Sequence, residues 1–330
     1  MATYKGTHGT KIQNYTSDPA NSLTGQVWYN ATTQALKVNA GALVGAWATG
    51  GNLNTARAYL AGAGISTAAL AFGGKNPMTG ATEKYNGTAW TEVNNLNQTR
   101  ASLAGCGTQT AALAFGGLSP GTDNPGKDVT ELWNGTNWTE VNDLNTGRTY
   151  TMGFGTATAA LVGGGAPPPV GITNTELWNG TNWTEVNDLN LKRRGWGASG
   201  TTTAGLGFSG YSDPSVPSNF IKNVESWNGT NWTEVNDVNT ERGQGPFGCG
   251  TQTSSLFAGG GNPGKVALTE SWNGTNWAEV GDLSSVRDRV GSAGTDNTSG
   301  LIFGSGPGPS PLAVTEEWSY VGGIQTIDTD

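Results

Sequence analysis

The sequence has few of the side chains that metal sites, disulfide scaffolds and most acid–base catalysts need. Its 330 residues include one His, His8, and two Cys, Cys106 and Cys249. A disulfide framework in a chain of this length needs more Cys. One His and two Cys also leave almost nothing to bind zinc, copper or iron. We therefore expect no metal, no cofactor and no disulfide, with both Cys as free thiols.

Charge and long apolar runs are also scarce. Charged residues make up 13% of the chain and its net charge is −8, whereas charged residues make up about 25% of a typical protein. A net negative chain is poorly suited to polyanionic phosphates, so we expect no binding to nucleic acid. No stretch approaches the roughly 18 apolar residues of a membrane span, so we expect no membrane insertion.

Glycine and tryptophan are the abundant residues, with 53 Gly and 13 Trp. The glycines follow no three-residue period, which excludes a collagen-like chain. The tryptophans argue against disorder, because disordered chains are poor in aromatic residues. This composition indicates short strands joined by tight turns.

An internal repeat organises most of the chain. The sequence E-L-W-N-G-T-N-W-T-E-V-N-D-L-N occupies 131–145 and recurs at 176–190. Close copies begin at Glu83, Glu225 and Glu270, and a degenerate copy begins at Glu316. The first aromatic residues of successive units lie 48, 45, 49, 45 and 46 residues apart. This period is typical of four-stranded propeller blades and too long for leucine-rich or ankyrin repeats.

Each unit divides into four predicted strands, a to d. In one unit these are a small-residue strand at 101–107, an apolar strand at 111–117, T-E-L-W at 130–133 and N-W-T-E-V at 137–141. The dipeptide Asn134-Gly135 predicts a type I′ hairpin between strands c and d.

The units resemble the kelch family. The matching features are an Arg that opens each unit, Gly-Gly at the end of most b strands, and paired aromatic residues on strands c and d. The c–d hairpin is shorter than the usual kelch hairpin. The resemblance implies an all-β fold, a six-bladed kelch-like β-propeller over residues 46–320.

The sixth blade needs a strand from the other end of the propeller. The last unit lacks strand d after Trp318, whereas Trp47 stands alone before the first full unit. Leu53 follows Trp47 by six residues, as Leu96 follows Trp90. We therefore predict that the strand around Trp47 closes the last blade, which removes free sheet edges.

Residues that recur once in each unit are predicted to be structural. One such set is the d-strand tryptophans, which we expect to pack between blades: Trp47, Trp90, Trp138, Trp183, Trp232 and Trp277. The repeated Arg and Glu are expected to form ion pairs or Arg–carbonyl bonds between blades. Because a catalytic residue normally breaks the repeat, we predict no catalytic residue and no enzyme. Asp143 and its equivalents are predicted to cap turns, with calcium binding as the alternative.

Binding is predicted on the face that carries the b–c and d–a connections. The b–c loops vary in length and sequence, and variable loops on a rigid scaffold commonly carry function. A basic cluster beside an unrepeated Trp lies on the same face and suits an acidic glycan or a partner protein. The candidate binding residues are Lys192, Arg193, Arg194, Trp196, Asn76, Asp123, Asn124, Tyr211, Asp213 and Phe220. The alternative is that these are solvated loops without a ligand.

Residues 1–45 and the tail 321–330 lie outside the repeat. Residues 24–38 predict a small hairpin with strands Q-V-W-Y and A-L-K-V around the turn N-A-T-T. This pattern and the near-identical repeats resemble virion structural and tail-appendage proteins of marine bacteriophages. The resemblance implies an N-terminal segment that attaches to other virion proteins, an oligomer in the virion, and a propeller that binds a host surface glycan, a host protein or a neighbouring virion protein. A decoration protein without a ligand and a free lectin-like propeller are the alternatives.

Overall fold

The fold is built from strands alone in the part of the chain that the structure describes. This computed structural model describes residues 12–39, 44–121, 126–166, 171–212, 220–245, 247–305, 311–321 and 324–326. These residues form seven four-stranded sheets. The chain divides into two compact units, one of Trp47–Ser319 and a smaller one of Met1–Ala46 with Tyr320–Asp330.

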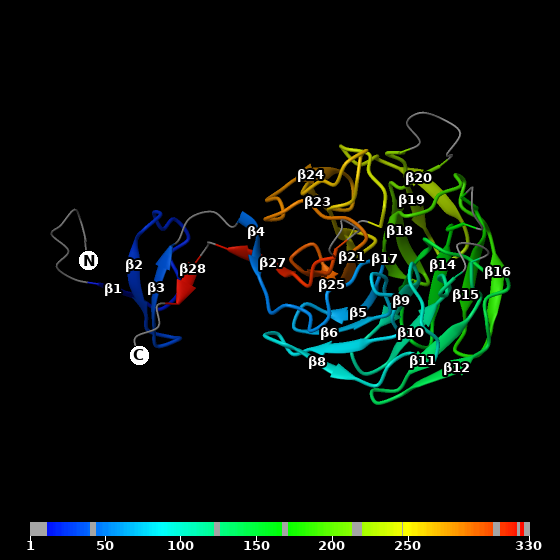
Figure 1. Cartoon of the computed structure of the whole chain (residues 1–330). Helices are drawn as coiled ribbons and strands as arrows, with labels where there is room; N and C mark the ends of the chain where they lie inside the picture. Colours follow the sequence, from blue (N-terminus) through cyan, green and yellow to red (C-terminus); the bar gives the residue numbers. More distant parts are fainter. Residues whose placement is uncertain are drawn as a thin grey trace. The chain divides into compact units, whose positions relative to one another are not determined.

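Six of the sheets build the larger unit, and each has four strands in the order a, b, c, d (Figure 1). The a strands are β5 (Ala61–Ile65), β9 (Ala104–Gly107), β13 (Met152–Gly155), β17 (Gly197–Thr201), β21 (Phe247–Thr251) and β25 (Gly291–Asp296). The b strands are β6 (Ala68–Phe72), β10 (Ala112–Phe115), β14 (Ala160–Gly163), β18 (Ala204–Phe208), β22 (Ser254–Ala258) and β26 (Ser299–Phe303). The c strands are β7 (Thr82–Tyr85), β11 (Thr130–Trp133), β15 (Thr175–Trp178), β19 (Val224–Trp227), β23 (Thr269–Trp272) and β27 (Thr315–Val321). The d strands are β8 (Trp90–Val93), β12 (Trp138–Val141), β16 (Trp183–Val186), β20 (Trp232–Val235), β24 (Trp277–Glu279) and β4 (Val44–Thr49).

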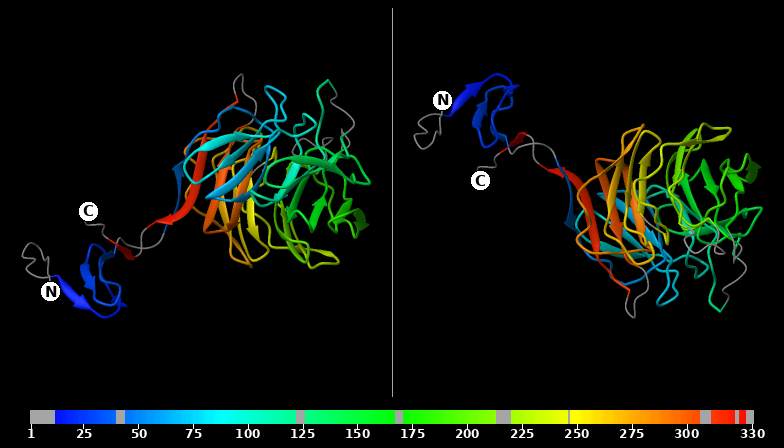
Figure 2. Two further views of the ribbon diagram at one scale, coloured as in Figure 1. Left: turned by 90° about the horizontal axis from the view of Figure 1, so that it is seen from below. Right: turned by 90° about the horizontal axis from the view of Figure 1, so that it is seen from above.

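The a strands line a central channel. Each contacts the a strand of the next sheet, and the cycle closes where β25 contacts β5. The sheets surround this axis in Figure 1 and are seen from two further sides in Figure 2. A ring of radially arranged four-stranded sheets is a β-propeller.

The residue types of strands a and b match the positions of these strands in the sheets. Strand b is packed on both faces by neighbouring sheets, so it is apolar throughout, and all four residues of β10 are buried. Strand a crowds around the axis and uses small residues. A Cβ on Gly105 would lie 2.3 Å from the ring of Phe72 in the preceding sheet. Close packing thus leaves room for the large side chain of strand b and for no side chain at the facing position of strand a.

The d-strand tryptophans join neighbouring sheets, as the sequence predicts. The ring centroids of Trp138 and Phe72 lie 4.9 Å apart. The Trp138 Nε1–H also donates to Thr82 Oγ1 of the preceding sheet at 3.1 Å. Trp277 has a buried Nε1 without a partner, because Val224 occupies the place of that threonine in its neighbour.

The predicted closing strand is confirmed. Strand β4 lies beside β27 and completes the sheet β25-β26-β27-β4. Trp47 Nε1 donates to Thr269 Oγ1 at 3.0 Å, the bond that every other d-strand tryptophan except Trp277 also makes. The sheet therefore combines residues near both ends of the chain.

The predicted type I′ turn between strands c and d is wrong. Asn134 is absent from the described residues with positive φ, whereas Gly135 has φ of 94°. Four residues connect Trp133 to Trp138, and the Asn134 Oδ1 accepts the N–H groups of Thr136 and Asn137 at 3.0 and 2.8 Å. The hydrogen bonds of the asparagine side chain stabilise this turn, so a second residue with positive φ is not needed.

The smaller unit holds the seventh sheet, in the order β1-β2-β3-β28. The predicted hairpin is confirmed as β2 (Val27–Asn30) paired antiparallel with β3 (Ala35–Asn39). Two strands were not foreseen, β1 (Gln13–Tyr15) parallel to β2 and β28 (Ile324–Thr326) antiparallel to β3. Residues predicted as a separate tail thus supply a strand to the N-terminal sheet.

Candidate functional site

Six buried arginines stabilise the propeller sheets through ion pairs. Each opens a unit and pairs with the Glu of strand c, and these framework arginines are Arg57, Arg100, Arg148, Arg193, Arg242 and Arg287, paired with Glu83, Glu131, Glu176, Glu225, Glu270 and Glu316. All six guanidinium groups are fully buried. The pairs lie within one sheet, so the expectation of pairs between blades is wrong.

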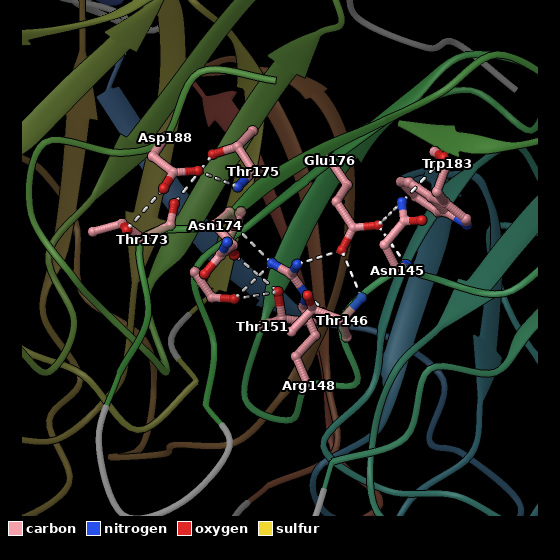
Figure 3. A network of polar contacts seen from close by, with 12 residues as sticks. Asn145, Thr146, Arg148, Thr151, Thr173, Asn174, Thr175, Glu176, Trp183 and Asp188 are labelled. Atoms are coloured by element: carbon pink, nitrogen blue, oxygen red, sulfur yellow. Dashed lines mark hydrogen bonds and ion pairs between the residues drawn. The ribbon is translucent and has the colours of Figure 1, made fainter. Parts of the chain in front are cut away.

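The network around Arg148 shows how the pair is satisfied (Figure 3). Arg148 donates to Glu176 Oε1 at 2.5 Å and to the carbonyl of Asn174 at 2.7 Å. The second oxygen, Glu176 Oε2, accepts the backbone N–H and side-chain amide of Asn145 at 2.7 and 2.9 Å. A buried ion pair needs such additional hydrogen bonds to offset its desolvation.

The repeated aspartates were predicted to cap turns, but Asp143, Asp188 and Asp282 instead join the end of strand d to the first residue of strand c. Asp188 Oδ1 accepts the backbone N–H of Thr175 at 3.2 Å, and Asp143 accepts that of Thr130 at 3.0 Å. In the described ranges, no group of three or more His, Cys, Asp or Glu is arranged to hold a metal ion. The same ranges contain no helix long and apolar enough to cross a membrane.

The predicted basic cluster does not form one surface. Arg193 is a framework arginine and Trp196 is fully buried among core residues that include Trp232. Trp196 stands three residues after its framework arginine, as the buried Leu103 does after Arg100. Burial removes both side chains from any ligand-binding surface, which corrects the prediction for these two residues.

The other predicted binding residues have different positions. Lys192, Arg194, Tyr211 and Phe220 are partly exposed, and Asn76 is exposed. Asp123, Asn124 and Asp213 lie outside the described residues. Of the candidates that are described, Arg194 and Tyr211 line one pocket.

The pocket lies on a ring of residues at one end of the channel. Each stands two positions after a framework arginine and has positive φ, and the members of this mouth ring are Tyr59, Ser102, Tyr150, Gly195, Gln244 and Arg289. Backbone hydrogen bonds connect one sheet to the next around the ring. Tyr59 N–H donates to Arg289 O at 2.8 Å, Ser102 N–H to Tyr59 O at 2.9 Å, Tyr150 N–H to Ser102 O at 3.0 Å and Gly195 N–H to Tyr150 O at 2.8 Å.

Two further bonds complete the mouth ring. Gly245 N–H donates to Gly195 O at 3.3 Å, and Arg289 N–H donates to Gln244 O at 2.9 Å. The backbone hydrogen bonds thus run around the whole ring, with Gly245 in place of Gln244 as the donor at one step, while the side chains of the ring vary. Such a ring fixes unrelated side chains at equivalent points around the axis.

A pocket of about 190 Å³ opens over the mouth ring. Its lining, hereafter the mouth pocket, consists of Tyr59, Tyr150, Arg194, Gly195, Tyr211, Gln244 and Arg289. The rings of Tyr59 and Tyr150 meet edge to face with centroids 5.9 Å apart. These two residues also line a smaller cavity with Leu60 and Val290, so they separate the mouth pocket from the channel below.

Two arginines lie against the aromatic rings of the pocket. The Arg289 guanidinium carbon is 4.9 Å from the centroid of Tyr59. That of Arg194 lies 5.8 Å from the centroid of Tyr150 and 5.6 Å from that of Tyr211. Stacking on aromatic rings holds a guanidinium in place while it leaves N–H donors free for a ligand.

A short bridge positions Tyr211 beside Arg194. The two residues exchange backbone hydrogen bonds, each N–H donating to the other carbonyl at 2.9 Å. Tyr211 also pairs with Phe220 at the other end of the same b–c loop, and their rings stack with centroids 4.4 Å apart. The loop is thus closed at its base, which holds the Tyr211 side chain over the pocket.

The electrostatic balance of the mouth pocket is positive. The pocket-lining set contains two arginines and no carboxylate. Asp288 lies buried beside it, 3.3 Å from Arg289 and 3.7 Å from Lys265. Burial raises the pKa of Asp288, and the two cations oppose this shift. One buried carboxylate shared by Arg289 and Lys265 leaves the charge of Arg194 uncompensated within this group of residues.

Two tyrosines of the pocket, Tyr59 and Tyr211, stay protonated at neutral pH. Burial raises the pKa of Tyr59 and of Tyr211. A hydrogen bond from Gln244 and the charges of Arg289 and Arg194 partly offset the shift at Tyr211. The lining that is described contains no His, Cys or carboxylate to act as a base. The arrangement suits binding through stacking and hydrogen bonds.

The central channel has fewer side chains that could bind or react with a ligand than the mouth pocket has. Its cavity of about 140 Å³ is lined mainly by glycine and alanine of the a strands, together with Cys106, Cys249 and a few larger apolar residues such as Phe154. Both Cys are free thiols. Burial raises the pKa of Cys106 to about 12, and it also raises that of Cys249. Neither Cys has the lowered pKa that makes a thiol reactive.

Sequence reasoning missed Tyr59, Tyr150, Gln244 and Arg289. A signal for them was present, because the position two residues after each framework arginine is variable, with Tyr in two units and Ser, Gly, Gln and Arg in the others. The units agree at the arginine itself and disagree at this neighbour. Aligning the units on the arginine and looking for the variable column would have found the mouth ring.

Comparison with known proteins supports the fold. No family model matches the chain, and no curated protein matches it. The chain is similar to the solved structure of YjhT, with a TM-score of 0.67 over 84% of this chain and 99% of that chain, at 14% sequence identity. A likeness at this identity concerns the β-propeller fold alone.

Proposed function

We propose that this chain is a non-enzymatic binding protein of a bacteriophage virion, and that its propeller binds its ligand in the mouth pocket. The proposal takes the six propeller sheets as six kelch-like blades. Its central support is the contrast between repeated and unrepeated side chains. Framework residues recur in every sheet, whereas the side chains of the mouth pocket converge from different sheets and, apart from the equivalent Tyr59 and Tyr150, differ from sheet to sheet.

The location on a virion rests on the resemblance of the repeats to phage virion proteins. The smaller unit has its own sheet, built from both ends of the chain. We propose that this unit attaches to other virion proteins in an oligomer, and that the propeller binds a host receptor or a neighbouring virion protein.

Two experiments test the proposal. The first labels particles from the source with antibody to this chain and locates the label by electron microscopy. Label on fibres or tail tips supports receptor binding, whereas no label on any particle contradicts the virion assignment and favours a free lectin-like propeller.

The second experiment measures binding of the purified chain to host cells. Tyr59→Ala combined with Arg194→Ala removes an aromatic and a charged side chain of the mouth pocket and should abolish binding. Lys75→Ala is the matched control, because Lys75 bridges to Ala58 as Tyr211 bridges to Arg194 and does not line the pocket. Equal binding by the double variant and the control would contradict the proposal, and would favour a decoration protein without a ligand.

A further inference from the structure

The mouth pocket has the size of a site for one small ring. Its volume of about 190 Å³ is below the roughly 300–1,000 Å³ of sites for drug-sized ligands. The side chain of Tyr211 and the contacting pair Tyr59 and Tyr150 line this space. The pocket therefore suits one terminal residue of a longer molecule, with the remainder extending into solvent.

The aromatic groups in the pocket present both ring faces and hydroxyl groups. Tyr59, Tyr150 and Tyr211 all line it. Tyrosine offers a rigid apolar ring for stacking and a polar end for hydrogen bonds. Gln244 adds an amide with two donors and an acceptor. A sugar ring has the complementary surface, with apolar C–H faces and hydroxyl groups around its edge.

The positive charge of the pocket favours sugars that carry an anionic group. Arg194 lies against the ring of Tyr211 and Arg289 against that of Tyr59, and both arginines line the mouth pocket. A guanidinium matches a carboxylate through two parallel N–H···O bonds. No carboxylate contributes to the described lining of the pocket, so the bonding capacity of Arg194 toward an anion is available to a ligand.

We infer that the mouth pocket binds a carboxylated sugar residue at the end of a glycan, with the carboxylate held by Arg194 and Arg289 and the ring against the tyrosines. This inference rests on the proposed function and names the ligand class for the same site. The carboxylate replaces water around two cations that the fold has already placed. Neutral sugars lack this group and leave both guanidinium groups without a ligand partner.

Calorimetric titration of the full chain tests the inference with three probes: glucuronic acid, glucose and glucose 6-sulfate. Glucuronic acid should bind at least about tenfold more tightly than glucose, the difference that one charge-assisted hydrogen bond supplies. The affinity should fall as ionic strength rises. Equal affinities for glucuronic acid and glucose would overturn the inference. Tighter binding of glucose 6-sulfate than of glucuronic acid would overturn the choice of a carboxylate.

Variants separate charge from shape. Arg194→Ala should lose at least about tenfold in affinity for glucuronic acid. Arg194→Lys should recover only part of this loss, because lysine keeps the charge without the planar fork. Lys75→Ala should bind like the unchanged chain. Unchanged affinity in Arg194→Ala and in Arg289→Gln, with melting temperatures showing that both fold, would overturn the inference.

The two proposals fail in different ways. If pocket variants abolish cell binding while glucuronic acid does not bind, the ligand class is wrong and the binding function stands. If glucuronic acid binds in the pocket and cell binding does not depend on it, the ligand class stands and the proposed function is wrong.

Discussion

Arg193 and Arg194 are neighbours in sequence and belong to two different regions of the propeller. Arg193 is fully buried and pairs with Glu225 at 2.6 Å. Arg194 is partly exposed and lies between the rings of Tyr150 and Tyr211. The first has an equivalent in every sheet and the second has none. The comparison shows that adjacent residues of a repeat protein can have different roles. Residues that recur in every sheet stabilise the fold, and residues that vary between sheets are available for recognition.

The largest expected effect comes from exchanging each arginine for methionine. Arg193→Met leaves Glu225 buried without its cation and should lower the free energy of unfolding by about 3–5 kcal/mol. Arg194→Met should change it by about 0.5 kcal/mol or less, as surface substitutions usually do. Urea denaturation of both variants measures the difference. Equal losses would remove the distinction between the two regions.

A substitution in the closing strand tests whether equivalent tryptophans contribute equally to stability. Trp138 is buried and Trp47 is partly exposed, although they occupy the same repeat position. Trp138→Ala should cost about 3–5 kcal/mol, and Trp47→Ala should cost less because less of its surface is removed from water. Thermal unfolding of both variants provides the measurement. A larger loss at Trp47 would mean that ring closure dominates over local packing.

Restoring the repeated threonine in the one unit that lacks it should stabilise the protein. Trp277 lacks an acceptor for its Nε1–H because Val224 replaces the repeated threonine. Val224→Thr should stabilise the protein by about 1 kcal/mol through this new hydrogen bond. Its matched control is Thr175→Val, which removes the acceptor of Trp232 and should cost about 1–3 kcal/mol. If Val224→Thr destabilises the chain as much as the control does, the two positions are not equivalent.

The smallest effect is expected at Asp288, where the two regions meet. Burial raises its pKa above the ordinary value, so the folded protein binds this proton more tightly than the unfolded chain. The stability that this carboxyl contributes is therefore largest at low pH and is lost as the pH rises through its raised pKa. The difference in unfolding free energy between the unchanged chain and Asp288→Asn should follow this direction. A difference that grows with pH would contradict the assignment.

The framework was accessible from the sequence because repetition multiplies its signal. Trp138, Arg100 and Glu131 recur at fixed spacing, so the strands and the structural role of these residues follow from a comparison of the units. The displaced strand at Trp47 follows from the same spacing. The sequence did not show whether the arginine pairs lie within or between blades, because strands β9 and β10 and the b–c loop separate Arg100 from Glu131.

The candidate site was only partly accessible. Arg194 and Tyr211 were predicted, because the first lies in a basic cluster and the second in a variable loop. Arg193 and Trp196 share that cluster and are buried. Local composition does not distinguish them from Arg194, whereas their repeat positions, equivalent to Arg100 and Leu103, do. Tyr59 and Arg289 are 230 residues apart in the chain, yet their backbones are joined by a hydrogen bond of 2.8 Å.

The sequence by itself determined the repeating strands, the small and large residues that alternate between strands a and b, and the borrowed strand β4. These depend on local patterns and on copies that can be compared. Only the tertiary structure decided which unrepeated side chains meet. Ring closure brings the same position of six distant units to one channel mouth, and the positive φ of that position turns Tyr59, Tyr150 and Arg289 toward a common space that no single unit contains.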